Sequence, residues 1–149
     1  NTMPISLRIS TVVALLVLAG AASMASANEV LFSCTTTNGK PVQLSQSGDT
    51  LHYRFGAANK PELVFSNRTA DIENGSCNSG NSSHSWVLLR NGGYDYMISA
   101  HDQTGKPSQA TLDVYRSNAK ASSATLICRS GSVRHQLSRL SSSISPCGQ

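Results

Sequence analysis

Apolar and polar residues alternate along much of this chain. Leu51, Tyr53 and Phe55 share one face of an extended segment, and His52 and Arg54 lie on the other. A period of two is typical of a strand with one buried face. Related apolar segments recur at 30–36, 42–44, 62–66, 84–90, 94–101, 110–115 and 124–128. The pattern therefore predicts about eight short strands.

Turn residues separate these segments. Asn38-Gly39-Lys40-Pro41 follows the first segment, and Asn91-Gly92-Gly93 joins segments 84–90 and 94–101 into the clearest predicted hairpin. Asn-Gly pairs readily take the left-handed backbone angles of tight hairpins. With no long amphipathic helix in view, the chain is predicted to be all-β, an antiparallel sandwich or barrel with a short helical turn at 135–140.

The segment 67–83 interrupts the alternation. Its part 74–83 is almost wholly small and polar, so it predicts a loop that buries little apolar surface. A loop of this length in a compact domain tends to be either functional or disordered. In the hairpin that follows, Trp86 and Leu88 share one face and are expected to be buried, and Tyr94, Tyr96 and Ile98 share another.

The chain has four cysteines, Cys34, Cys77, Cys128 and Cys147. An even number of cysteines in an exported chain implies disulfides, so two are expected. Four cysteines allow three pairings. Cys34 and Cys128 lie in alternating segments near the two ends of the domain, whereas Cys77 and Cys147 lie in polar segments. This placement favours Cys34–Cys128 and Cys77–Cys147. Because no C-x-x-C pair is present and the histidines are scattered, no metal site is expected.

The first 27 residues resemble a cleavable export signal. Arg8 supplies a positive charge, residues 11–22 form an apolar run, and Ala25-Ser26-Ala27 matches the A-x-A pattern of a cleavage site. The run is shorter than the roughly 20 residues of a membrane-spanning helix. We therefore expect a signal at 1–27 and one β domain at 28–149, located in the periplasm or secreted, with no membrane anchor after cleavage.

The charge of the chain argues against nucleic-acid binding. Lys and Arg number 12 against 8 Asp and Glu, a formal net charge of +4, and the basic residues are spread along the sequence. Nucleic-acid binders usually cluster such residues on one stripe. A solvated surface is the simpler interpretation.

No catalytic motif stands out. The chain has no Gly-x-Ser-x-Gly elbow, and the adjacent His101 and Asp102 would point to opposite faces of a strand. The few acidic residues are dispersed, and Gly92-Gly93 lies between two strands instead of before a helix, unlike a phosphate-binding loop. A serine hydrolase assembled from distant strands is left open, but we expect no enzyme activity and no cofactor.

In layout the mature chain resembles the small periplasmic lysozyme inhibitors and effector-immunity proteins of Gram-negative bacteria. The shared features are the signal, the opening Leu31-Phe32-Ser33-Cys34 segment, the Asn38-Gly39-Lys40 turn and the late Leu126-Ile127-Cys128 segment. The resemblance implies a protein that blocks a cell-wall or envelope hydrolase. Inhibitors of c-type lysozyme carry a Ser-Gly-x-x-Tyr motif, and the nearest segment here, Asn91-Gly92-Gly93-Tyr94, lacks the serine and has another spacing.

Two functional hypotheses follow. In the first, the protein binds a partner enzyme through Asn91, Gly92, Gly93 and Tyr94 at the hairpin tip and through Asn78 and Asn81 in the polar segment. In the second, it is an envelope-associated structural or glycan-binding module without catalysis, with Tyr94 and Tyr96 stacking on sugars. A long unpaired edge strand would also allow a homodimer through sheet extension.

Overall fold

The structure, a computed structural model, describes residue 2 and residues 27–148. The predicted export signal lies almost entirely outside the described residues, so it stays a prediction. Among the residues described, no helix combines the length and the hydropathy that crossing a membrane requires.

The first sheet is an antiparallel meander of four strands from the first third of the domain, with the short strand β10 from near the C-terminus at one edge. Its strands lie in the order β10-β1-β2-β3-β4. Their bounds are β1 Glu29–Thr35, β2 Pro41–Ser47, β3 Thr50–Ala57, β4 Lys60–Arg68 and β10 Arg134–His135. The 3₁₀ turn η1 (Thr69–Asp71) then leads the chain to the second sheet.

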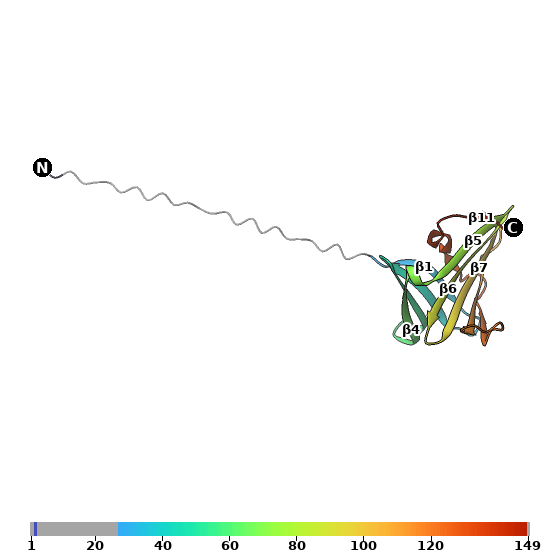
Figure 1. Cartoon of the computed structure of the whole chain (residues 1–149), viewed down its shortest axis with the longest axis horizontal. Coiled ribbons are helices and arrows are strands. Elements are labelled where there is room, and N and C mark those ends of the chain that lie inside the picture. The colour runs from blue at the N-terminus through green and yellow to red at the C-terminus, as the bar shows by residue number, and fades with distance from the viewer. Residues whose placement is uncertain (1, 3–26, 149) are drawn as a thin grey trace.

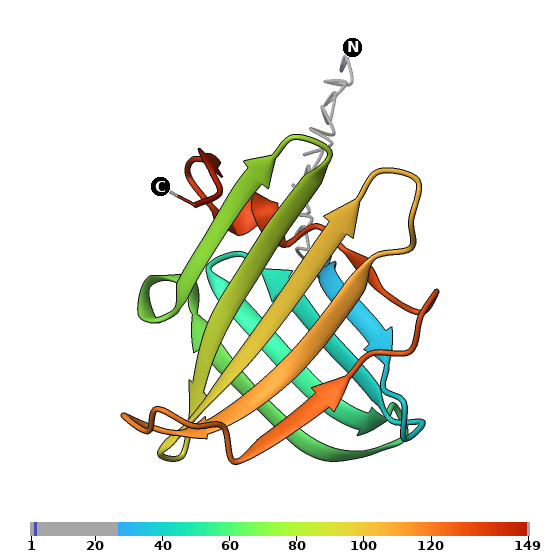
Figure 2. The same ribbon diagram turned by 90° about the vertical axis from the view of Figure 1, so that its right-hand side faces the viewer.

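The second sheet has the order β11-β5-β6-β7-β8-β9 and packs face to face with the first (Figures 1 and 2). Its strands are β5 Glu73–Ser79, β6 Ser82–Asn91, β7 Tyr94–Gln103, β8 Gln109–Arg116, β9 Ala124–Ile127 and β11 Ser145–Pro146. All pairs are antiparallel except β11 with β5. The predicted all-β, sandwich-like class is therefore confirmed, although the described residues hold eleven strands instead of eight.

The core lies between the two sheets and is built from one face of each strand. Leu44, Leu51 and Tyr53 from the first sheet, and Val87 and Ile98 from the second, are at most 2% exposed. At one end of the core, three aromatic rings from β3, β4 and β7 pack together, with centroids 4.7 to 5.7 Å apart: Tyr53, Phe65 and Tyr96. Tyr96 therefore packs between the sheets.

The expectation that Trp86 and Leu88 face the core is wrong. Trp86 is half-buried on the outer face of β6, and Val87 and Leu89 point inward. The residues paired across the sheet explain why Val87 and not Trp86 faces inward. Val87 is opposite Ile98, which is opposite Leu112, whereas the residues in line with Trp86 on β7 and β8 are polar. Burying the wholly apolar row removes more apolar surface from water.

The predicted loop at 74–83 is also wrong, because most of it forms strand β5 and the tight turn into β6. Its backbone pairs with β6 along its whole length, from Glu73 opposite Leu88 to Ser79 opposite Ser82. Gly75 explains why a small residue suits this strand: a Cβ there would lie 2.6 Å from Nε1 of Trp86, so the indole covers the glycine. The small residues of β5 thus accommodate a large neighbour.

Both predicted disulfides are present. Cys34–Cys128 joins the end of β1 to the residue after β9, and Cys77–Cys147 joins β5 to the C-terminal tail. Backbone bonds close the first junction further, because the Thr37 amide donates to the Ile127 carbonyl (2.8 Å) and the Arg129 amide to the Thr35 carbonyl (2.7 Å). The end of β1 is therefore fixed to the end of β9.

The tail runs beside the edge of β5 that does not pair with β6. The helical turn predicted at 135–140 is a short 3₁₀ turn, η2 (Leu137–Leu140), anchored by Leu137, which is 1% exposed. The hydroxyl of Ser141 then donates to Asn74 Oδ1 (3.0 Å). These contacts and the disulfide Cys77–Cys147 together hold the tail beside β5.

Candidate binding surface

The predicted hairpin tip, Asn91 to Tyr94, is a two-residue turn between β6 and β7. Asn91 and Tyr94 are directly opposite in register, and Gly92 and Gly93 between them have φ of 59° and 82°. Positive φ at both central residues is the requirement of a type I′ turn, which glycine meets without steric cost. Both glycines are exposed, so the tip protrudes into solvent at one end of the sandwich (Figure 2).

The tip is braced by the strand beside it. The Ser117 amide donates to the Gly93 carbonyl (2.9 Å), and the Ser117 hydroxyl donates to Asp95 Oδ1 (3.1 Å). The guanidinium of Arg116 lies over the Tyr94 ring, 6.0 Å from its centroid. The backbone and the aromatic ring of the tip are therefore held in one arrangement before any partner binds.

The two arginines near the tip differ in their surroundings. Arg90 lies 3.4 Å from Glu73 and 3.9 Å from Asp95, and it donates to the Asp71 carbonyl. Arg116 is exposed and forms no ion pair within the described part of the chain. Arg116 is thus the positive charge that the tip can offer to a partner.

The other predicted contact residues, Asn78 and Asn81, do not join the tip. Asn78 is exposed and is the last-but-one residue of β5. Asn81 lies in the turn between β5 and β6, where its carbonyl accepts from the Thr104 amide (2.9 Å). That turn lies at the opposite end of β6 from the tip (Figure 2). At about 3.4 Å per residue, a ten-residue strand separates the two by roughly 30 Å. One partner cleft cannot receive both turns.

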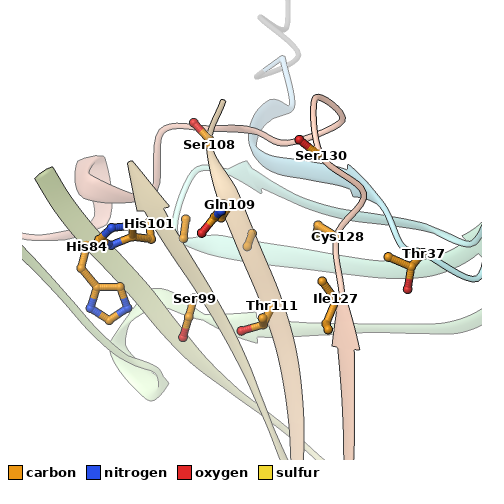
Figure 3. A pocket seen from close by; sticks show the side chains of 12 residues that line it. Thr37, His84, Ser99, His101, Ser108, Gln109, Thr111, Ile127, Cys128 and Ser130 are labelled. Carbon is orange, nitrogen blue, oxygen red and sulfur yellow. The ribbon is translucent and has the colours of Figure 1, made fainter. Parts of the chain in front are cut away.

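A groove of about 550 Å³ lies between these ends, over the outer face of the second sheet (Figure 3). Its lining includes His84, His101, Ser99 and Thr111 from β6 to β8, with Ile127 at the far side. The groove was not predicted from the sequence, because its walls come from several strands. One signal was present: His84 and His101 flank the predicted hairpin, and the structure places them directly opposite each other.

A second polar cluster joins the two sheets near the β7–β8 connection. His135 Nε2 lies 2.8 Å from Asp102 Oδ2, and the Ser108 hydroxyl donates to the other carboxylate oxygen. Burial raises the pKa of Asp102, but hydrogen bonds from Ser108 and the interaction with His135 outweigh it and hold the pKa below its usual value.

This cluster lacks the geometry of a serine-hydrolase relay. Such a relay needs the serine hydroxyl against the imidazole, with the carboxylate on the other ring nitrogen. Here Ser108 donates to the carboxylate instead, and the second nitrogen of His135 faces the Leu137 amide at 3.4 Å. The arrangement fits a polar contact that ties β10 to the second sheet.

Comparison of the chain with protein-family models, with curated proteins and with solved structures gave no match.

Proposed function

We propose that the protein is an exported binding protein that inhibits or neutralises a partner enzyme, with the tip Asn91 to Tyr94 entering the partner's cleft. The observation that carries the proposal is the bracing of this tip by Ser117 and Arg116. A loop that is ordered before binding loses little conformational entropy in the complex, which favours affinity.

The chemistry of the tip supports this role. Tyrosine and arginine are the residue types that most often contribute large binding energies at interfaces. Tyr94 and Arg116 stand side by side at the tip, next to two glycines that leave the backbone open to a close approach. Glycan-cleaving hydrolases carry paired carboxylates in their clefts, and the unpaired Arg116 is complementary to such a charge.

The scaffold also supports the proposed inhibitor function. Two disulfides hold the described domain, which suits an oxidising compartment such as the periplasm. Taken with the layout that resembles periplasmic inhibitors, this makes a cell-wall or envelope hydrolase the proposed partner.

The proposal is tested by capture and by matched variants. The tagged mature protein, with disulfides verified, is used to capture partners from cell and competitor extracts, and the bound proteins are identified by mass spectrometry. We expect one stoichiometric hydrolase, whose activity the protein inhibits. Tyr94→Ala and Arg116→Ala should each weaken this complex by about tenfold or more, which corresponds to about 1.4 kcal/mol.

The turn at the other end of β6 provides the control. Asn81→Ser leaves the tip untouched and should bind as tightly as the wild type. Loss of binding in Asn81→Ser with full binding in Tyr94→Ala would move the contact to the opposite end of the sandwich. If no protein is captured by material with intact disulfides, the inhibitor proposal is wrong.

A second candidate function, binding of envelope glycan, is favoured by Trp86. Its indole is half-buried on the outer face of β6, in a row with the hydroxyl residues Ser99 and Thr111 of the groove. Aromatic rings beside hydrogen-bonding groups suit the faces and hydroxyls of sugars. Tyr96 no longer supports this function, because it packs between the sheets. Binding of purified cell-wall polymer without any protein partner, lost in Trp86→Ala, would favour this candidate over the first.

A further inference from the structure

Two histidines that are well separated in the sequence meet on the outer face of the second sheet. His84 of β6 and His101 of β7 are directly opposite in the antiparallel register. Their inward neighbours, Ser85 and Ala100, are buried, so the two imidazoles project outward. They form one side of the groove, where Figure 3 shows the two rings next to each other.

The ring nitrogens of this pair are available to a ligand. Of the four histidines, His52 lies 2.8 Å from the Ser66 hydroxyl and His135 lies 2.8 Å from Asp102. Within the described residues, neither His84 nor His101 has a hydrogen-bond partner for its ring. Two adjacent imidazoles with free nitrogens are an arrangement that protein packing alone does not require.

We propose that His84 and His101 together bind a divalent transition-metal ion, of the Cu²⁺ or Zn²⁺ class. Directly opposed residues of an antiparallel pair have Cβ atoms about 5 Å apart, so the two rings can converge on one ion. Metal–imidazole bonds are about 2.0–2.1 Å long, which needs ring nitrogens roughly 3 Å apart. Neutral imidazole is a preferred ligand of copper, zinc and nickel, whereas Mg²⁺ prefers oxygen.

The rest of the coordination shell faces the groove. The described residues hold no group of three or more His, Cys, Asp and Glu that would enclose a metal. Cys77, on the other side of His84 in the register, is bonded to Cys147 and supplies no thiolate. Water or a ligand in the groove would occupy the remaining positions, as in metal sites that keep an open position for a substrate.

This site is independent of the proposed function at the tip. His84 lies near the start of β6, and the tip lies beyond its other end. Metal binding at His84 and His101 therefore does not depend on whether the tip binds a partner enzyme.

Titration of the mature, disulfide-intact protein with CuCl₂, ZnCl₂ and MgCl₂ tests the site. We expect calorimetry to give one Cu²⁺ or Zn²⁺ per chain and no heat with Mg²⁺, with Cu²⁺ bound more tightly than Zn²⁺. His84→Gln and His101→Gln should each weaken binding by about tenfold or more, because each removes one of two protein ligands. In NMR spectra, Cu²⁺ should broaden the imidazole signals of His84 and His101 first.

His52→Gln is the matched control, since His52 also lies on a strand but is bonded to Ser66. It should bind the metal as the wild type does, and unchanged circular dichroism and unfolding temperature should establish that all three variants are folded. The proposal is overturned if no ion binds, if both groove variants keep the wild-type affinity, or if His52→Gln loses as much affinity as they do.

Discussion

The surroundings of Asp102 differ from what its position in the sequence suggests. In the sequence it follows His101, yet its carboxylate turns to His135, which lies 33 positions further along the chain. His135 is almost fully buried, with 9% of its side chain exposed, whereas 35% of the Asp102 side chain is exposed. One carboxylate thus connects β10 of the first sheet with the β7–β8 end of the second.

The lowered pKa of Asp102 predicts how stability depends on pH. A carboxyl group whose pKa is lower in the folded state binds protons more weakly there than in the unfolded chain. Its contribution is therefore fully present above the unfolded pKa of about 3.9 and is lost as the pH falls through the folded value. Asp102→Asn should lower the free energy of unfolding by about 1 kcal/mol at pH 7, a value reduced for partial exposure.

Urea unfolding at pH 7, 5 and 3 measures this effect. The difference between wild type and Asp102→Asn should shrink between pH 5 and pH 3. Asp49→Asn, at an exposed carboxylate 3.7 Å from Arg68, serves as the control and should change stability little. A difference that stays constant over this range would show that the charge of Asp102 does not contribute.

At the scale of elements, the sequence located most strands but not always their inward face. Alternation in β6 allows either Trp86 and Leu88 or Val87 and Leu89 to be buried, because all four are apolar. The choice depends on the rows formed with β7 and β8, which one segment alone does not reveal. The hairpin tip was predictable because turn chemistry is local, as Gly92 and Gly93 demonstrate.

Strand β5 was missed for a related reason. Its small polar residues have low strand propensity, and the strand forms because β6 provides the pairing partner and Trp86 provides the cover for Gly75. The groove and the Asp102–His135 contact were likewise out of reach, since both join residues from separate strands. Tertiary context decided these features.

Asn67 joins the two sheets at the edge formed by β4. Its side chain imitates a strand partner: Nδ2 donates to the Arg90 carbonyl and Oδ1 accepts from the Arg90 amide, both at 2.8 Å. Asn67→Ala should remove both bonds and lower the free energy of unfolding by about 1–2 kcal/mol. Hydrogen exchange should show the Arg90 amide losing protection by about tenfold or more, which corresponds to about 1.4 kcal/mol.

The neighbouring Arg68→Ala provides the comparison, because it removes only an exposed ion pair with Asp49. It should leave exchange at Arg90 unchanged. If Arg90 remains equally protected in Asn67→Ala, the side chain does not hold the two sheets together at this edge.

At the scale of the whole molecule, the two disulfides have different tasks although they close loops of similar length. Cys34–Cys128 spans 94 positions and joins two segments that backbone bonds also hold together, whereas Cys77–Cys147 spans 70 and holds a tail whose strand β11 pairs with β5 over only two residues. By chain entropy alone each would stabilise the fold by about 4–5 kcal/mol. The folded chain should nevertheless gain more conformational freedom when the second bridge is removed than when the first is removed.

We therefore expect the paired replacement Cys34→Ala with Cys128→Ala to cost close to the full amount, about 4 kcal/mol, because the strands stay paired and the folded chain regains little freedom. The replacement Cys77→Ala with Cys147→Ala should cost clearly less, about 1–2 kcal/mol, because release of β11 returns entropy to the folded state as well. Urea unfolding compares the two, and limited proteolysis should cleave the tail after Ser141 only in the second variant. Equal losses of stability, with the tail still protected, would mean that β11 is held by its contacts with β5 and that the bridge only reinforces them.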